Sequence, residues 1–360
     1  MPTLNGLGLK ISTKQKIHFE MEKHDRIFGK KITDTLLRNH FYTFSESLKL
    51  HNPKYKEIRL IKPKLQEPTE HYICPLCVTS QVVLLGNILM KFEEFTIDHV
   101  PPESIGGKAK LLTCQVCNNK AGEYEAELVE KLRLHTFGDR KEGSGIKKIS
   151  VKKDSNDNIL HKGFIKNGED GIPFIDFPQK AKENNPELKY ILKEFGAAVQ
   201  EIQITIKTPD DEKLTKALLK SAYLLCFIHW GYEFIYSEIG YKIRKVLHGE
   251  EKYPIPLPIA FVDKTKQELP IGIGIIQKPT ELQSYYVTIP FIKSSDNYTA
   301  IIIIPPPTKD GWNRLEEIHE FFTKNKGVVF DYEYTFQPGE QTLPQNLNGY
   351  TETWANFKKW

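Results

Sequence analysis

The second half of the chain consists of short runs in which apolar and polar residues alternate. A period of two is typical of strands that bury one face. We expect strands over residues 149–152, 160–165, 199–206, 255–262, 271–276, 285–292, 298–304 and 328–336. A helix is expected over 311–323, between the last two strands. The pattern therefore predicts an α+β fold with antiparallel strands for this half.

Apolar residues recur at helical spacing in three other places. The spacing predicts helices over 33–48 and 120–134. A longer helical block follows Thr208, which we expect as its N-cap, with Pro209 at the first helical position and two acids in the first turn. A second helix is expected after Gly231.

Breaks in these patterns divide the chain, whose 360 residues suit two or three domains. Residues 1–70 are predicted to be an N-terminal helical and connector region, rich in Lys and His. Residues 71–145 form a compact second region that ends in a stretch with Gly and Ser. Residues 146–360 are the C-terminal α+β domain, for which recognition, sensing and dimerisation all stay open.

Composition excludes a membrane protein and a disordered one. Charged residues make up 27% of the chain and its mean hydropathy is −0.43. No run approaches the roughly 20 apolar residues that span a bilayer, and the first residues do not resemble a secretory signal. We therefore expect a cytoplasmic protein with no membrane partner. The net charge is only +4, so any affinity for nucleic acid must come from a local patch.

Four of the five cysteines form two CxxC pairs, Cys74 with Cys77 and Cys114 with Cys117, while Cys226 stands alone in an apolar run. An odd number of cysteines in a reducing compartment argues against disulfides. Two CxxC pairs can supply the four thiolates of a closed tetrahedral zinc site. We predict one structural Zn²⁺ there and a buried, inert thiol at Cys226.

The segment between and after the pairs carries further polar chemistry. It holds Asp98-His99, then Gly106-Gly107, then Leu-Leu-Thr before the second pair, with Asn118-Asn119 directly after it. In this order the residues resemble the HNH (ββα-metal) endonucleases, in particular those whose two CxxC pairs bracket the active site, and are similar to the recombination endonuclease VII family. The resemblance covers roughly residues 72–133.

The resemblance implies a zinc-stabilised ββα-metal module and a role for three residues. His99 would be the general base, and Asp98 and Asn118 would hold a catalytic Mg²⁺ or Mn²⁺. The chemistry agrees, since phosphodiester hydrolysis needs a base and a divalent cation, and hard cations prefer carboxylate and amide oxygens. The structural alternatives are a helix cap for Asn118 and a plain turn at the two glycines.

The chain departs from the family pattern in one place. Many members carry an Asn shortly before the third cysteine that orients the base, and here Lys108-Ala109-Lys110 stands instead. A backbone carbonyl could hold the histidine in its place. Members also carry an acid on the following helix, and the spacing does not decide among Glu123, Glu125 and Glu127.

Basic residues surround this module. Eight Lys or Arg against two acids lie between residues 131 and 153, a density that attracts a phosphate backbone regardless of sequence. The residues that we expect to contact nucleic acid are Lys108, Lys110, Lys120, Arg140, Lys141, Lys147 and Lys148.

The resemblance, together with the chemistry of its residues, implies a metal-dependent endonuclease that hydrolyses DNA. The choice between DNA and RNA stays open. A restriction or anti-phage effector is the expected setting, acting as a homodimer or with a defence-system partner. Two alternatives stay open: a zinc-ribbon binding or scaffold protein whose nuclease residues are vestigial, and a structure-selective DNA resolvase.

Overall fold

The computed structural model describes a subset of the chain in detail. The described residues are 42–43, 70–85, 88–91, 94–107, 109–138, 145–152, 161–171, 173–176, 203–206, 209–254, 272–290, 299–325, 331–336 and 349–357. Within them, antiparallel sheets and α-helices form a mixed α and β structure. The predicted class with antiparallel strands is confirmed at that level.

Two sheets precede the long helix α5. The first has the strand order β1-β2-β3-β4, formed by β1 (Tyr42–Thr43), β2 (Glu70–Ile73), β3 (Gln81–Leu85) and β4 (Ile88–Lys91). The second is the two-stranded pair of β5 (Phe95–Val100) and β6 (Ala109–Cys114), joined through the short 3-10 helix η2 (Glu103–Ile105). Helix α5 (Gln115–Gly138) follows β6 without a break.

Two further sheets follow α5. The first has the order β10-β7-β8-β9, from β7 (Gly145–Lys152), β8 (His161–Asn167), β9 (Pro173–Asp176) and β10 (Gln203–Ile206). The other has the order β13-β12-β11-β14, from β11 (Gly272–Lys278), β12 (Ser284–Pro290), β13 (Thr299–Ile304) and β14 (Asp331–Phe336). A 3-10 helix, η3 (Thr280–Leu282), joins β11 to β12.

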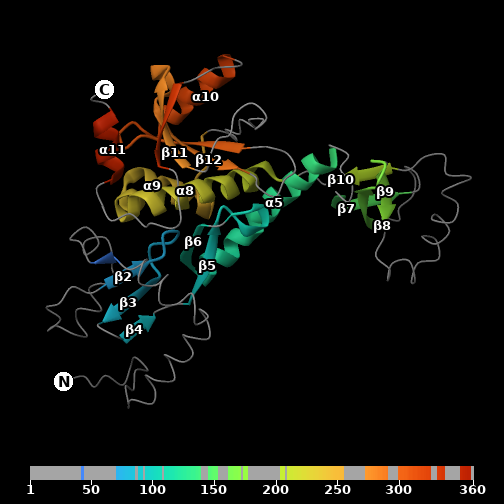
Figure 1. Cartoon of the computed structure of the whole chain (residues 1–360), viewed down its shortest axis with the longest axis horizontal. Coiled ribbons are helices and arrows are strands. Elements are labelled where there is room, and N and C mark those ends of the chain that lie inside the picture. Colours follow the sequence, from blue (N-terminus) through green and yellow to red (C-terminus); the bar gives the residue numbers. More distant parts are fainter. Residues whose placement is uncertain are drawn as a thin grey trace, which may run out of the picture.

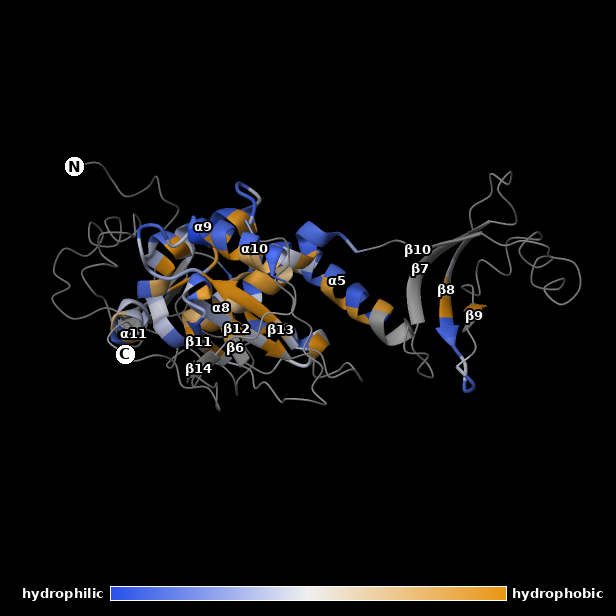
Figure 2. Cartoon of the chain, turned by 90° about the horizontal axis from the view of Figure 1, so that it is seen from above, coloured by the Kyte–Doolittle hydropathy of each residue, from blue (hydrophilic) through white to orange (hydrophobic). Residues whose placement is uncertain are grey.

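Helix α8 (Asp211–Tyr236) is the centre of the molecule, and α9 (Glu238–His248) folds back beside it. The sheet of β11 to β14, with α10 (Arg314–Lys324) and α11 (Gly349–Phe357), lies on one side of α8, and β2 to β6 lie on the other (Figure 1). The β7 to β10 sheet stands apart at the far end of α5 (Figures 1 and 2). No helix of the described residues is both long and apolar enough to cross a bilayer.

Burial explains why α8 is central. Its residues from Ala217 to Ile228 are all buried, and Figure 2 places this helix among the apolar strands. Trp230 packs its ring 4.6 Å from that of Tyr285 on β12 and 4.9 Å from that of Tyr350 on α11. These aromatic contacts join the C-terminal helix and sheet to α8. Trp230 and Tyr285 are both fully buried.

Most expected elements are present, with shifted ends. The expected helix over 120–134 is the longer α5, that over 311–323 is α10, and six expected strands match β7, β8, β10, β11, β12 and β13. The last expected strand matches β14, while 255–262 lies outside the described residues. The break expected at Gly231 is present as a kink inside α8, where Gly231 has a φ of 64°, and the helix expected after it is the last part of α8.

Two local predictions were wrong. The N-cap of α8 is Asp210 and not Thr208, because the Asp210 carboxylate accepts the backbone N–H groups of Glu212 and Lys213 at 2.9 and 3.1 Å. Pro209 therefore precedes the cap and does not stand at the first helical position. Of the helix expected over 33–48, the two described residues, Tyr42 and Thr43, pair with β2 as a strand. The rest of that range lies outside the described residues.

The hydrogen bonds of Tyr232 give a test of how α8 holds β2. Its hydroxyl accepts the N–H of Ile73 at 2.7 Å and donates to the carbonyl of Ile73 at 2.8 Å, in a buried setting. Tyr232→Phe leaves both backbone groups without these partners, so we expect urea unfolding to show a loss of about 1–3 kcal/mol. Tyr241→Phe is the control, because Tyr241 is 53% exposed. Equal stability of the two variants would contradict this packing.

Candidate metal centre and active site

The four cysteines of the CxxC pairs meet at one place. The sulfur atoms of Cys74, Cys77, Cys114 and Cys117 all lie within 4.8 Å of one another, and those of Cys77 and Cys114 are 3.9 Å apart. A Zn–S bond of about 2.3 Å puts the sulfurs of a tetrahedral site about 3.8 Å apart. The cluster could therefore hold a metal ion such as zinc.

Each pair is presented by local structure that its sequence explains. In the first, the N–H of Val78 donates to the carbonyl of Cys74 at 2.9 Å, and Val78 takes a φ of 52°, which turns the chain sharply after Cys77. In the second, Cys114 ends β6 and Cys117 lies in the first turn of α5. The N–H of Cys114 donates to the sulfur of Cys74 at 3.3 Å, so the two pairs are already in contact.

The thiols influence one another's protonation. Hydrogen bonds, first from Cys117 and then from Cys74, lower the pKa of Cys114 to about 7. Burial raises the pKa of Cys74 well above its ordinary value. A cysteine binds a metal as the thiolate. Binding of a cation at this cluster must therefore release the protons that the thiols carry.

Helices α8 and α9 hold the first cysteine pair from behind. The hydroxyl of Tyr223 donates to the carbonyl of Pro75 at 2.9 Å, and a ring nitrogen of His248 lies 3.1 Å from the carbonyl of Leu76. Arg244 in turn donates to the hydroxyl of Tyr223 at 2.9 Å. The backbone of the cysteine turn is thus bound to the helix pair that forms the core.

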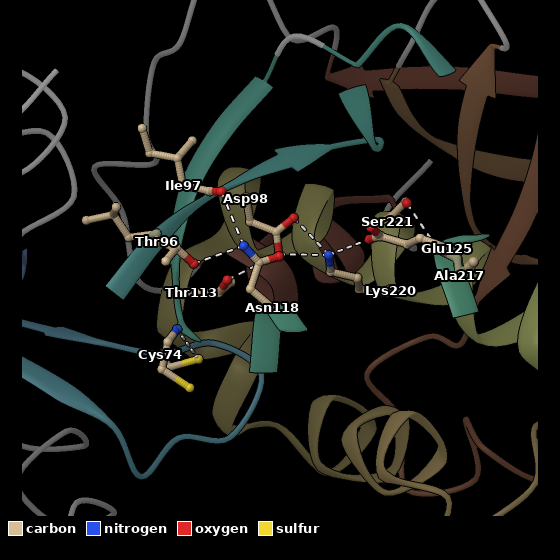
Figure 3. Close-up of polar contacts among 12 residues, drawn as sticks. Cys74, Thr96, Ile97, Asp98, Thr113, Asn118, Glu125, Ala217, Lys220 and Ser221 are labelled. Atoms are coloured by element: carbon tan, nitrogen blue, oxygen red, sulfur yellow. Dashed lines mark hydrogen bonds and ion pairs between the residues drawn. The ribbon is translucent and has the colours of Figure 1, made fainter. Parts of the chain in front are cut away.

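Asp98 lies on β5 and is buried, with 4% of its side chain exposed. Because Thr96 pairs with Thr113 across the two strands, the side chain of Thr113 lies diagonally beside Asp98 on the same face. The Thr113 hydroxyl donates to Oδ2 of Asp98 at 3.2 Å. The face that carries Asp98 is turned toward α5 and α8 (Figure 3).

A lysine that the sequence analysis did not single out binds this carboxylate. The Nζ of Lys220, on α8, lies 2.8 Å from Oδ1 and 2.7 Å from Oδ2 of Asp98. It also lies 2.6 Å from Oε1 of Glu125 on α5. Only 1% of the Lys220 side chain is exposed. Figure 3 shows the dashed contacts of Asp98 and Glu125 converging on this ammonium group.

The charges in this cluster act against burial. Burial opposes the charge of Lys220, but the carboxylates of Asp98 and Glu125 outweigh it and raise the pKa of Lys220 above its ordinary value. Burial raises the pKa of Glu125, and the attraction of Lys220 offsets only part of that rise. The ammonium is therefore charged at neutral pH, and it offsets the cost of placing the buried carboxylate of Asp98 beside the partly buried one of Glu125.

Asn118 lies in the first turn of α5, one residue after the last cysteine. Its Nδ2 donates to the hydroxyl of Thr96 at 2.9 Å and to the carbonyl of Ile97 at 3.4 Å. The side chain is therefore bound to the strand residues directly before Asp98 (Figure 3). With the nitrogen engaged, Oδ1 is the atom that remains for a cation. The simple helix-cap alternative does not describe these contacts, since both acceptors belong to β5.

His99 is half-buried and follows Asp98 on the strand, so its side chain leaves the opposite face of the pair. Its register partner is Lys110 on β6. Among the described residues no backbone carbonyl is hydrogen-bonded to the imidazole, so the orienting carbonyl that we considered is not found there. The structure brings Asp98 and Asn118 together and places His99 next to them on the other side of the strand.

Steric constraints require glycine at both positions, 106 and 107, of the loop between β5 and β6. Gly106 ends η2 with a φ of 95°, and its N–H donates to the carbonyl of Glu103 at 3.0 Å. A Cβ at Gly107 would lie 1.6 Å from the carbonyl oxygen of Pro101. The turn alternative thus accounts fully for this pair of glycines, and they need no contact with a ligand.

The expected nucleic-acid contacts are only partly described. Lys120 is exposed at the start of α5, and its Nζ lies 3.4 Å from the carbonyl of His248. Lys147 and Lys148 lie at a register shift in β7, where that strand has one residue more than β8. Their side chains and that of Lys110 are not described, and Lys108, Arg140 and Lys141 lie outside the described residues.

Sequence reasoning identified the cysteines but not the partner of Asp98. Lys220 follows three apolar residues and precedes a buried serine on α8, and a lysine at a buried helical position signals a paired charge. The sequence thus indicated that Lys220 would be paired with an acid, but it did not indicate which acid. Of the three acids considered on α5, Glu125 is the one that contacts Lys220, and it lies two helical turns after Asn118 and so on the same face. Cys226 is buried, as predicted.

Comparison of the chain with protein-family models, with curated proteins and with solved structures found no match. The likeness to HNH endonucleases therefore rests on the residues of the motif alone.

The four-cysteine cluster predicts the metal content of two variants. Cys114→Ser removes one of four thiolates, so bound zinc should fall to near zero and the region around β5 and β6 should unfold. Cys226→Ser removes a buried thiol outside the cluster and should leave the zinc content unchanged. Elemental analysis of the purified proteins measures both. Stoichiometric zinc in Cys114→Ser would contradict the four-cysteine site.

Proposed function

We propose that this chain is an HNH-type endonuclease that hydrolyses phosphodiester bonds of DNA with the help of a divalent cation. The observation that carries the proposal is the meeting of Asp98 and Asn118 beside His99, at the junction of the strand pair with α5. Around this junction, the cysteine cluster joins β2, β6 and α5. A nuclease needs such a fixed junction, because a base and a cation must act on the same phosphate.

The cysteine cluster would hold a structural Zn²⁺. All four ligands come from the protein, so this ion has no open coordination position for substrate. Its role would be to hold the start of α5 against the first cysteine turn. Asn118 follows Cys117 directly, and so the zinc would fix the position of Asn118 relative to β5.

A Mg²⁺ or Mn²⁺ would be held by Asp98 and Asn118. Their oxygens fit a hard cation by chemistry, and Oδ1 of Asn118 is left for it by the contacts of Nδ2. Bound there, the cation supplies positive charge to the phosphate and to the leaving oxygen. The oxygens of Asp98, however, already contact Lys220, so the cation and the ammonium compete for the same carboxylate.

His99 would take the proton of the attacking water. Its imidazole is half-buried and has no hydrogen bond or ion pair within the described part of the chain, so a ring nitrogen is open to accept a proton. The position of His99 next to Asp98 places this base within one residue of the cation ligand. Neighbouring residues of a strand point to opposite faces, so His99 can act as the base while Asp98 binds the cation.

DNA would be attracted by the basic residues around α5 and β7. Lys120, Lys147 and Lys148 belong to these two elements, which adjoin each other. Contacts of this type bind the phosphate backbone without regard to sequence. We propose a restriction or anti-phage effector as the biological setting, with the C-terminal helices and sheets responding to a site, a signal or a partner.

One observation favours a second function. Lys220 pairs with the carboxylate of Asp98, which a catalytic cation would need. Such a pairing is what we expect of a nuclease site that no longer binds its cation. In that case the chain would be a zinc-containing nucleic-acid-binding or scaffold protein. Measurement of DNA cleavage by a His99 variant distinguishes the two functions, because only the nuclease depends on His99 for a chemical step.

His99→Ala tests the proposal. Loss of a general base should reduce the single-turnover rate of DNA cleavage by about 10²–10⁴-fold. Binding of DNA and of Mn²⁺ should change little, because the imidazole is neither a phosphate anchor nor a proposed cation ligand. His319→Ala, a half-buried histidine on α10, is the matched control and should cleave at the wild-type rate. Wild-type cleavage by His99→Ala would refute the mechanism.

A further inference from the structure

The ammonium group of Lys220 lies where a bound cation would lie, between the carboxylates of Asp98 and Glu125. An ammonium group has three hydrogens to donate, and three carboxylate oxygens surround this one: both oxygens of Asp98 and Oε1 of Glu125, at 2.6 to 2.8 Å. Its donors are thus fully used within the cluster. Two carboxylates and one ammonium have a formal charge of −1, at a place where Lys220 and Asp98 are buried and Glu125 is partly buried.

The same oxygens suit a divalent cation. Asp98 and Glu125 come from different elements, β5 and α5, and their carboxylates converge on one point (Figure 3). A divalent ion at that point would balance both negative charges, whereas the ammonium balances one. The ion and the ammonium cannot share the point, because their positive charges would repel each other at a few ångströms in a weakly screened interior.

Lys220 is held in place by the position of α8. Its neighbours Leu219 and Ser221 are buried, and the helix packs against α5 on one side and the C-terminal sheet on the other. Withdrawal of the ammonium would leave the buried carboxylate of Asp98 and the partly buried one of Glu125 without their cation, which is costly unless another cation replaces it. Exchange of one cation for another avoids that cost.

We propose that Asp98 and Glu125 form a divalent-cation site that the chain's own Lys220 occupies, so that Lys220 acts as a built-in competitor of the metal. This proposal rests on the proposed function, because it concerns the carboxylate that the nuclease would use. It adds Glu125 as a cation ligand and makes α8 the element that controls access to the site. A displacement of α8 relative to α5 would withdraw Lys220 and open the site to the metal.

Titration of the full, zinc-loaded chain with Mn²⁺ in the absence of DNA tests the proposal. We expect the wild type to bind Mn²⁺ weakly and Lys220→Met to bind one equivalent at least about tenfold more tightly, since one positive charge has been removed. Addition of Asp98→Asn to Lys220→Met should abolish the gain. Lys216→Met, one turn earlier on α8 and paired with Glu212, is the control and should behave as the wild type.

Lys220→Gln provides a second variant, because its amide can still donate to Asp98 while it carries no charge. Should either variant unfold without metal, recovery of its far-ultraviolet circular dichroism on addition of Mn²⁺ supports the proposal, and failure to recover contradicts it. Wild-type affinity in a folded Lys220→Met, or a gain that survives Asp98→Asn, would also overturn it. A gain in Mn²⁺ affinity without any DNA cleavage would leave this site standing and refute the nuclease.

Discussion

A lysine ammonium buried between two carboxylates joins the three elements on which the rest of the structure depends. Asp98 belongs to β5, Glu125 to α5 and Lys220 to α8, and the contacts among them are 2.6 to 2.8 Å long. A buried charge without a partner is strongly destabilising, so the buried charges of Lys220 and Asp98 stabilise each other, and Glu125 adds a second carboxylate to the ammonium. These contacts hold the strand pair and α5 against the central helix.

The cysteine cluster and the tyrosines of α8 act on the same region from the other side. The cysteine turn is bound to α8 through the hydroxyls of Tyr223 and Tyr232, which contact the backbone of Pro75 and Ile73. A metal at the cluster would thus stabilise contacts that extend into the core of the C-terminal half. This continuity explains how a site between residues 98 and 125 can depend on a helix that starts at residue 211.

The sequence predicted what depends on local spacing. The two CxxC pairs predicted the cluster, the alternating runs predicted antiparallel strands, and Gly231 predicted the break in α8. Contacts between distant residues could not be predicted in this way. Lys220 and Asp98 are 122 positions apart, and no period or motif relates them. The N-cap at Asp210 differs from the prediction for a smaller reason, because Thr208 and Asp210 are both good caps and only the backbone geometry decides between them.

The central claim is that the chain cuts DNA with a divalent cation. Nicking of supercoiled plasmid by the zinc-loaded wild-type chain, with and without added Mg²⁺ or Mn²⁺, tests it most directly. Omission of the cation is a better comparison than a strong chelator, which would also remove metal from the cysteines. The account predicts open-circular or linear products only when the cation is present, with Mn²⁺ at high concentration competing best against Lys220. Intact plasmid under all these conditions, with DNA bound, would contradict it and favour a binding protein with a vestigial site.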